Sequence, residues 1–104
     1  MPTLFDVTYE IFTPESAAEG DADERGFISE NVSLRDAMQD LHATRTNEVD
    51  GVESIECDTS PRWVTVCNGM EYLTGATESR SLHIPDSVSD ATARRIARLA
   101  GARI

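Results

Sequence analysis

A serine and a histidine two positions apart are the residues whose types come nearest to a catalytic pair. Ser81 and His83 lie in an extended run from Ser79 to Ile84, where alternation directs both side chains to one face. A serine hydrolase also needs an acid that orients the histidine and donors for the oxyanion. The nearest acid, Glu78, falls on the opposite face of an ideal strand, and the sequence has no nucleophile elbow. We therefore expect that the protein is not an enzyme.

The cysteines and histidines are also the residue types that bind zinc. Cys57 ends one alternating run, and Cys67 lies in the next. If these runs form a hairpin, the two sulfurs are about 16 Å apart along the ladder, which exceeds the span of a disulfide. No Cys-x-x-Cys or His-x-x-x-His pair is present to begin a zinc site with His42 or His83. We expect two reduced thiols, no metal and no other cofactor.

The region after the first predicted helix carries weak signals. Its loop contains the alternating carboxylates Asp21-x-Asp23, but it lacks the spacing, the central glycine and the terminal glutamate of a calcium loop. We expect a solvated acidic turn. The residues that follow, Gly26 to Val32, are expected to form a connector in which Phe27 and Ile28 pack against the core.

Three arginines near the C-terminus could contact phosphate groups. A simpler interpretation is that they compensate the dipole of a helix, with Asp90 paired to Arg94 one turn further on. The arginines are Arg94, Arg95 and Arg98. Because the chain also lacks a glycine-rich phosphate loop, neither nucleotide binding nor direct nucleic-acid binding is expected.

Net charge is the most pronounced feature of the composition. The chain has 19 acids and nine bases, all of them arginine, for a formal net charge of −10. Residues 1–58 carry −12, and residues 59–104 carry +2. Such a field repels nucleic acid and membrane surfaces and attracts basic partners. The lack of lysine also allows a second interpretation, in which high genomic GC content or salt adaptation accounts for the arginines and the acids.

Length and hydrophobicity indicate one domain over residues 1–104. A chain of this size buries about 65% of its unfolded surface, which is enough for a single core. No apolar run approaches the ~18 residues of a membrane span, and the N-terminus lacks a signal-peptide pattern. We expect a soluble, cytoplasmic protein.

The N-terminal half predicts one strand and two helices. Leu4 to Phe12 alternates apolar and polar residues, which indicates a half-buried strand. Thr13 is a helix N-cap before Pro14, and Gly20 ends this short helix. Ser33 to Ala43 repeats apolar residues at helical spacing after a capping serine, which predicts an amphipathic helix.

The single tryptophan begins the strongest strand signal. Trp63 to Cys67 is rich in β-branched and aromatic residues and is expected to pack on the core, with Trp63 buried. The pair Asn68-Gly69 is typical of a type I′ turn, after which Met70 to Thr74 should return antiparallel. Val52 to Cys57 alternates and is expected to pair with the tryptophan strand.

The last predicted helix spans Ser87 to Ala100, with Ser87 or Ser89 as its cap and Gly101 after its end. Its buried stripe is expected to be Val88, Ala93, Ile96, Leu99 and Ala100. Together these elements predict an α+β fold. We expect a single two-layer domain, with a three- to four-stranded, mainly antiparallel sheet and two or three helices packed on one face.

Several short phrases along nearly the whole chain match a common pattern, most specifically between Glu78 and Pro85. They are Thr13-Pro14-Glu15-Ser16-Ala17, Arg25-Gly26-Phe27, Ser33-Leu34-Arg35-Asp36-Ala37, Ser60-Pro61-Arg62-Trp63, Thr74-Gly75, Glu78-Ser79-Arg80-Ser81-Leu82-His83-Ile84-Pro85 and Arg94-Arg95-Ile96-Ala97-Arg98-Leu99. In these phrases the chain resembles a family of uncharacterised small acidic proteins carried on bacterial phages, plasmids and integrated elements. The resemblance implies a genetic context and no catalytic residues.

Small acidic proteins in that context often block defence nucleases, with carboxylates in place of DNA phosphates. We therefore expect a non-enzymatic inhibitor of a nucleic-acid-handling complex, of the anti-CRISPR or anti-restriction type, whose partner is a basic nucleic-acid-binding protein. The alternative is a structural or regulatory accessory domain whose acidity is an adaptation to salt. The candidate partner-binding residues are Glu15, Glu19, Asp21, Asp23, Glu24, Asp36 and Asp40.

Overall fold

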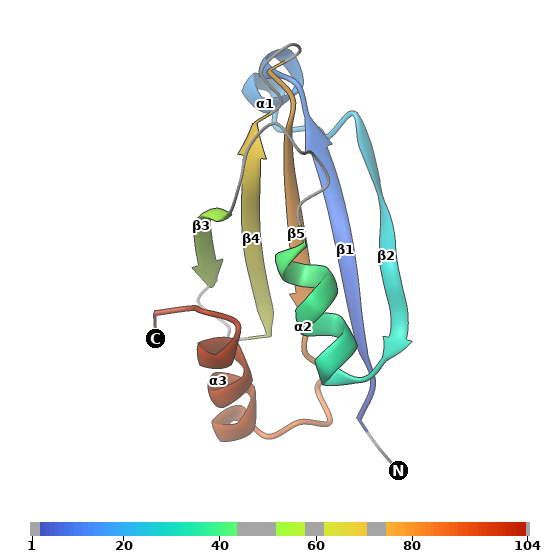
Figure 1. Ribbon diagram of the computed structural model, residues 1–104, viewed down its shortest axis with the longest axis vertical. Helices are drawn as coiled ribbons and strands as arrows, with labels where there is room; N and C mark the ends of the chain where they lie inside the picture. Colours follow the sequence, from blue (N-terminus) through green and yellow to red (C-terminus); the bar gives the residue numbers. More distant parts are fainter. Residues whose placement is uncertain (1–2, 44–51, 58–61, 71–74, 104) are drawn as a thin grey trace.

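The computed structural model of the chain describes residues 3–43, 52–57, 62–70 and 75–103. Five strands form one antiparallel sheet in the order β2-β1-β5-β4-β3 (Figure 1). The strands are β1 (Phe5–Phe12), β2 (Glu24–Val32), β3 (Val52–Cys57), β4 (Trp63–Met70) and β5 (Thr77–His83). The helices are α1 (Pro14–Glu19), α2 (Leu34–His42) and α3 (Asp90–Leu99).

The helices divide between one face of the sheet and one end of it. Helix α2 lies over β5 and β1, α3 lies beside it toward β4 and β3, and α1 lies at the end where β1 finishes (Figure 1). The molecule measures 44 × 24 × 21 Å. The predicted α+β class with an antiparallel sheet is confirmed. The sheet has one strand more than the expected range, because the segment assigned to a connector belongs to β2.

The hydrophobic core lies between the sheet and helices α2 and α3. Strand β5 shows how the two faces divide, because burial alternates strictly along it. Glu78, Arg80 and Leu82 are buried on the helix side, while Ser79 and Ser81 between them face the other way. The largest fully buried side chains are Leu41, Leu82, Ile84, Val7, Val64 and Val66.

Strand β1 and helix α1 form where the sequence predicts them. Phe5 and Val7 are buried, as the alternation of β1 requires. Thr13 is extended at the N-cap of α1, and its side chain accepts a hydrogen bond from the Ser16 backbone N–H. The Ser16 hydroxyl oxygen accepts the Thr13 backbone N–H in return, which completes a capping box. Gly20 ends the helix at φ 73°, a conformation that favours glycine.

Helices α2 and α3 also begin at serine caps. Ser33 caps α2 as predicted, and Ser89 rather than Ser87 caps α3. The buried stripe of α3 differs from the prediction at one position. Leu99 was expected in the core but is 69% exposed, and Ala97 is buried instead. The reason is geometric. At about 100° per residue, Ala93, Ile96, Ala97 and Ala100 lie within about 100° of one another around the helix, and Leu99 lies about 60° outside that stripe.

The segment Gly26 to Val32, expected to be a connector, pairs with β1 as part of β2. The register of this pairing shifts, and Asn31 has a φ of 52° within the irregular part. The Asn31 backbone N–H donates to the Asp6 carboxylate at 2.8 Å, which satisfies a group that the ladder leaves unpaired. Ile28 packs partly against the core as predicted, but Phe27 is 57% exposed and does not.

The predicted type I′ turn at Asn68-Gly69 is wrong. Both residues lie inside β4, which continues to Met70. The register between β4 and β5 shifts from Asn68 to Met70, so Gly69 marks an irregularity in the strand rather than its end. The return strand is β5, and residues 71–74, part of the return strand predicted at Met70 to Thr74, lie outside the described residues. Strands on both sides of β4 supply ladder hydrogen bonds, which outweigh the local turn preference.

Trp63 was expected in the core, and this expectation is wrong. Its side chain is 43% exposed on the face of the sheet away from α2 and α3. The indole stacks on the ring of His83, with centroids 4.4 Å apart and planes at 25°. Val64, the next residue, takes the buried position instead. Since successive side chains of a strand alternate between faces, burying Val64 directs Trp63 outward.

The backbone register keeps the two cysteines apart. Cys57 is opposite Val64, and Cys67 is opposite Ser54. Ser54 and Cys57 are three positions apart on β3, about 10 Å at the rise of a strand. This separation is shorter than expected from the sequence, because the register differs from the one assumed, but it still exceeds the reach of a disulfide.

A buried ion pair joins α2 to the sheet. The Arg80 Nε donates to the Glu78 carboxylate at 2.6 Å, and the two side chains are 8% and 6% exposed. The Arg80 Nη1 donates to the backbone carbonyl of Asp40, also at 2.6 Å. That carbonyl lies in the last turn of α2, where the helix dipole favours a cation.

Arg62 fastens the start of β4 to the start of α3. Its Nη1 donates to the Pro85 carbonyl at 2.9 Å, and its Nη2 donates to the Asp90 carboxylate at 2.9 Å. Asp90 therefore pairs with Arg62, and the predicted pair with Arg94 is wrong. Arg62 is only 16% exposed at its side chain, so it holds the carboxylate from the protein side, whereas Arg94 projects into solvent.

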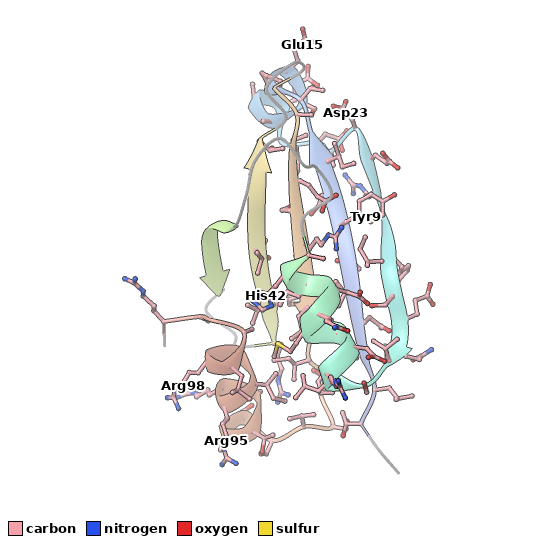
Figure 2. The ribbon with its side chains drawn as sticks, in the orientation of Figure 1. Tyr9, Glu15, Asp23, His42, Arg95 and Arg98 are labelled. Atoms are coloured by element: carbon pink, nitrogen blue, oxygen red, sulfur yellow. The ribbon has the colours of Figure 1, made fainter. Side chains whose placement is uncertain are left out.

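His42 connects the C-terminal ends of α2 and α3. Its Nδ1 is 2.9 Å from the Met38 carbonyl oxygen, and its Nε2 is 2.9 Å from the Ala100 carbonyl oxygen. A neutral imidazole donates to one of these carbonyls, and an imidazolium donates to both. The side chain therefore joins the C-terminal ends of the two helices (Figure 2).

Truncations at Leu82 and Trp63 should differ in their effect on stability, because Leu82 is on the covered face of the sheet and Trp63 is on the open face. Leu82→Ala removes a fully buried side chain and should cost about 2–5 kcal/mol of the free energy of unfolding. Trp63→Ala removes a half-exposed ring and should leave a cooperative melt with a much smaller loss. Thermal melts followed by circular dichroism measure both. A Trp63→Ala variant that is less stable than Leu82→Ala would contradict this assignment of faces.

The buried ion pair should respond differently to single and double replacement. Arg80→Met removes the guanidinium from a buried carboxylate and should cost about 3–5 kcal/mol of the free energy of unfolding. Arg80→Met combined with Glu78→Leu removes both charges and should recover most of that loss. Urea denaturation of the three proteins tests this. A double variant as unstable as Arg80→Met would show that the pair does not couple as described.

Candidate functional site

The catalytic pair considered from the sequence is engaged in structural contacts. Ser81 and His83 share the outer face of β5, as predicted. The Ser81 hydroxyl is 2.9 Å from the hydroxyl of Thr65, and the His83 ring is stacked on Trp63. Glu78 lies on the other face, beneath α2, as predicted. Within the described residues, no group of three or more His, Cys, Asp or Glu side chains could hold a metal ion.

Five of the seven predicted partner-binding residues gather at one end of the molecule. They lie on α1, on the turn that follows it and at the first residue of β2. Figure 2 shows Glu15 and Asp23 at this end, above the sheet. We call this group the acidic cap, and it consists of Glu15, Glu19, Asp21, Asp23 and Glu24. All five residues are exposed.

Asp23 is the structural centre of the acidic cap. Its Oδ2 accepts the Ser16 hydroxyl at 2.9 Å and the Thr13 backbone N–H at 3.1 Å. These bonds, first from the Ser16 side chain and then from Thr13, hold the pKa of the Asp23 carboxyl below its ordinary value. Asp23 therefore closes the turn between α1 and β2 onto the N-cap of the helix, and it places the neighbouring carboxylates.

The other members of the acidic cap differ in their contacts. Asp21 forms an exposed ion pair with Arg25 at 3.0 Å, and the Glu24 carboxylate accepts the Tyr9 hydroxyl at 2.9 Å. Glu15 and Glu19 make no ion pair or hydrogen bond within the part of the chain that the structure describes. The carboxylates of α1 are thus the members of this group that are available to a partner.

Asp36 and Asp40, the remaining predicted residues, lie apart from the acidic cap. Both belong to α2, Asp36 in its first turn and Asp40 near its end. Asp36 is exposed where the helix dipole favours an acid, and the backbone carbonyl of Asp40 receives Arg80. The structure therefore gives these two residues a role in α2 and does not bring them together with the other five.

Arginines occupy the opposite end of the molecule. Arg95 and Arg98 project from α3 at the lower end, while Glu15 is at the upper end (Figure 2). Arg94, Arg95 and Arg98 border one shallow surface hollow together with Asp90. The acidic cap and the α3 arginines therefore lie at opposite ends of the molecule, with Asp90 among those arginines and Arg25 beside the acidic cap.

The outer face of the sheet holds a second surface that the sequence analysis missed. Two exposed aromatic side chains, Phe27 and Trp63, border a hollow of about 430 Å³ in this face. We call this hollow the aromatic groove. It is lined by Thr8, Tyr9, Glu10, Arg25, Gly26, Phe27, Trp63 and Ser81. A sequence signal existed, because Trp63 and Phe27 each precede a better core candidate, Val64 and Ile28, that alternation would bury.

Comparison with known proteins gives no further guide to the site. No protein family, curated protein or solved structure was found to match the chain. Of the helices that the structure describes, none is long and apolar enough to cross a membrane. The resemblance to proteins of phages and plasmids remains a prediction.

The charge of Asp23 should stabilise the protein in a pH-dependent way. Because its pKa is lowered on folding from an ordinary value of 3.8, the stabilisation is present above that pH and is lost as pH falls through the folded value. Asp23→Asn keeps the shape and an acceptor but removes the charge. Its melting temperature should be lower than that of the wild type at pH 7, and the two should converge only once pH has fallen below the lowered pKa of the folded state, which lies under 3.8. A difference that persists unchanged at low pH would contradict the role of the charge.

Proposed function

We propose that this protein is a non-enzymatic binding protein whose acidic cap engages a basic surface on another protein. The observation that carries the proposal is the gathering of five carboxylates at one end of an elongated molecule, with its exposed α3 arginines at the other. Separated charges of this kind orient a protein during encounter, so that the acidic end meets a basic partner first.

The position of the acidic cap is held by side-chain hydrogen bonds at the start of α1. The capping box of α1 and the bonds to Asp23 fix the turn from which these carboxylates project. Glu15 and Glu19 therefore project from a short helix of defined orientation. The backbone positions of these two residues are therefore set by the helix, while their carboxylates remain available to arginines and lysines in place of phosphate groups.

The partner that best fits this chemistry is a nucleic-acid-handling complex. Such a complex presents a basic channel, and a net charge of −10 on the protein would compete with DNA or RNA for it. Together with the resemblance to proteins of mobile elements, this supports an inhibitor of the anti-CRISPR or anti-restriction type. The alternative is an accessory domain whose acids serve solubility in salt. An even coat of acids would favour that alternative, and the gathering of five acids at one end favours binding.

Charge reversal at Glu15 and Glu19 tests the proposal. The wild-type protein is titrated into plasmid-cleavage assays with a panel of restriction endonucleases and CRISPR effector nucleases at low and physiological salt. Inhibition of at least one nuclease is expected, and it should weaken as salt screens the acidic cap. Glu15→Arg combined with Glu19→Arg should abolish that inhibition, with little change in melting temperature at exposed sites.

The matched control is Glu30→Arg combined with Asp86→Arg, which makes the same charge change at exposed acids outside the acidic cap. It should retain inhibition. Equal loss in the control would show that net charge, and not the acidic cap, is responsible. A wild-type protein that inhibits no nuclease, and whose melting temperature rises markedly toward molar salt, would support salt adaptation instead.

A further inference from the structure

The aromatic groove has a regular construction across the sheet. Phe27 on β2 is opposite Thr8 on β1, and Thr8 is opposite Ser81 on β5. Trp63 on β4 is in the neighbouring row, opposite His83, on which it stacks, and it lines the same hollow. Two small hydroxyl residues therefore form the floor between two aromatic walls. The result is a hollow open to solvent, with flat apolar surfaces on either side.

A carboxylate lies within this groove. Glu10 is two residues along β1 from Thr8, so alternation places it on the same face, and it lines the hollow. It forms no ion pair or hydrogen bond within the described residues. The neighbouring cation, Arg25, is opposite Glu10 in the ladder but is bonded to Asp21 of the acidic cap at 3.0 Å. The groove thus combines aromatic faces with an acid that forms no ion pair with any described residue.

We propose that the aromatic groove binds an arginine side chain presented by a basic protein partner. A guanidinium is planar and stacks on aromatic rings, and a carboxylate accepts its N–H groups in a paired geometry. The groove supplies both, with Phe27 and Trp63 as walls and Glu10 as acceptor. This proposal rests on the basic partner of the proposed function. The acidic cap attracts that partner over a long range, and the aromatic groove recognises one of its arginine side chains.

Charge decides between this ligand and a nucleobase. Exposed aromatic residues on an open sheet also suit base stacking. The lining contains one acid, Glu10, and one base, Arg25, and Arg25 is already paired with Asp21. The phosphates of a nucleic acid would therefore meet Glu10 and a chain of net charge −10, which opposes binding. An arginine brings a charge of the opposite sign. The groove therefore favours a cationic protein segment over a nucleic acid.

Trp63 is the only tryptophan of the chain, so its fluorescence reports on the groove directly. The probe is the capped tripeptide acetyl-Gly-Arg-Gly-amide, with the neutral citrulline tripeptide as its control. The arginine peptide should change the emission of Trp63 in a saturable way, and the citrulline peptide should not. Glu10→Gln should weaken arginine binding about tenfold or more, the effect expected from losing a charged hydrogen-bond acceptor. Phe27→Ala should weaken it as well.

Glu30→Gln is the matched control, because it neutralises an exposed acid that is also on a strand but outside the groove. It should bind the arginine peptide as the wild type does. Equal responses of Glu10→Gln and the wild type, or equal responses to arginine and citrulline, would overturn the proposal. So would a response to oligothymidylate without one to the arginine peptide. The titration contains no nuclease, so its result tests arginine binding by the groove independently of the inhibition proposed for the acidic cap.

Discussion

The arrangement of helix and sheet depends on the ion pair buried between them. Arg80 and Glu78 lie two residues apart on β5, so the alternation that buries Leu82 buries them too. Buried charges are costly unless each has a partner, and here the arginine is shared between the carboxylate and the last turn of α2. The strand and the helix end must therefore come together in one register. Apolar packing alone would fix the position of α2 less narrowly, because methyl and methylene contacts have little directionality.

In this arrangement one face of the sheet packs against helices and the other is open to solvent. Helices α2 and α3 share one core with the inward side chains, and that core includes the buried ion pair. Neither helix lies over the other face, which keeps Trp63 and Phe27 partly exposed. A sheet with one covered face and one open face is common among antiparallel sheets. Here the open face carries two exposed aromatic side chains among its polar residues, which is why it is a candidate for recognition.

The acidic cap and the aromatic groove are neighbouring surfaces, and Arg25 lies between them. The acidic cap owes its position to hydrogen bonds around Asp23 that also complete the N-cap of α1. Arg25 connects it to the aromatic groove, since its guanidinium bonds to Asp21 while its strand position faces Glu10. The two surfaces therefore meet along the start of β2. A basic partner that approaches the acidic cap would reach the groove without crossing the molecule.

The sequence by itself determined the α+β class, the caps of α1 and α2, β1 and β3, because these depend on signals within a few residues of one another. For the cap of α3 it left two serines, Ser87 and Ser89. The acids available for a site could also be named, although not which of them gather. Only the tertiary structure decided that Asn68-Gly69 continues a strand, and that Trp63 and Phe27 face outward beside Glu10. The reason is that a strand shows two faces, and which one is buried depends on register with its neighbours, where a slip of one residue exchanges them. Hydrophobicity alone predicts that Trp63 and Phe27 are buried, but in the structure the next residues, Val64 and Ile28, pack against the core instead.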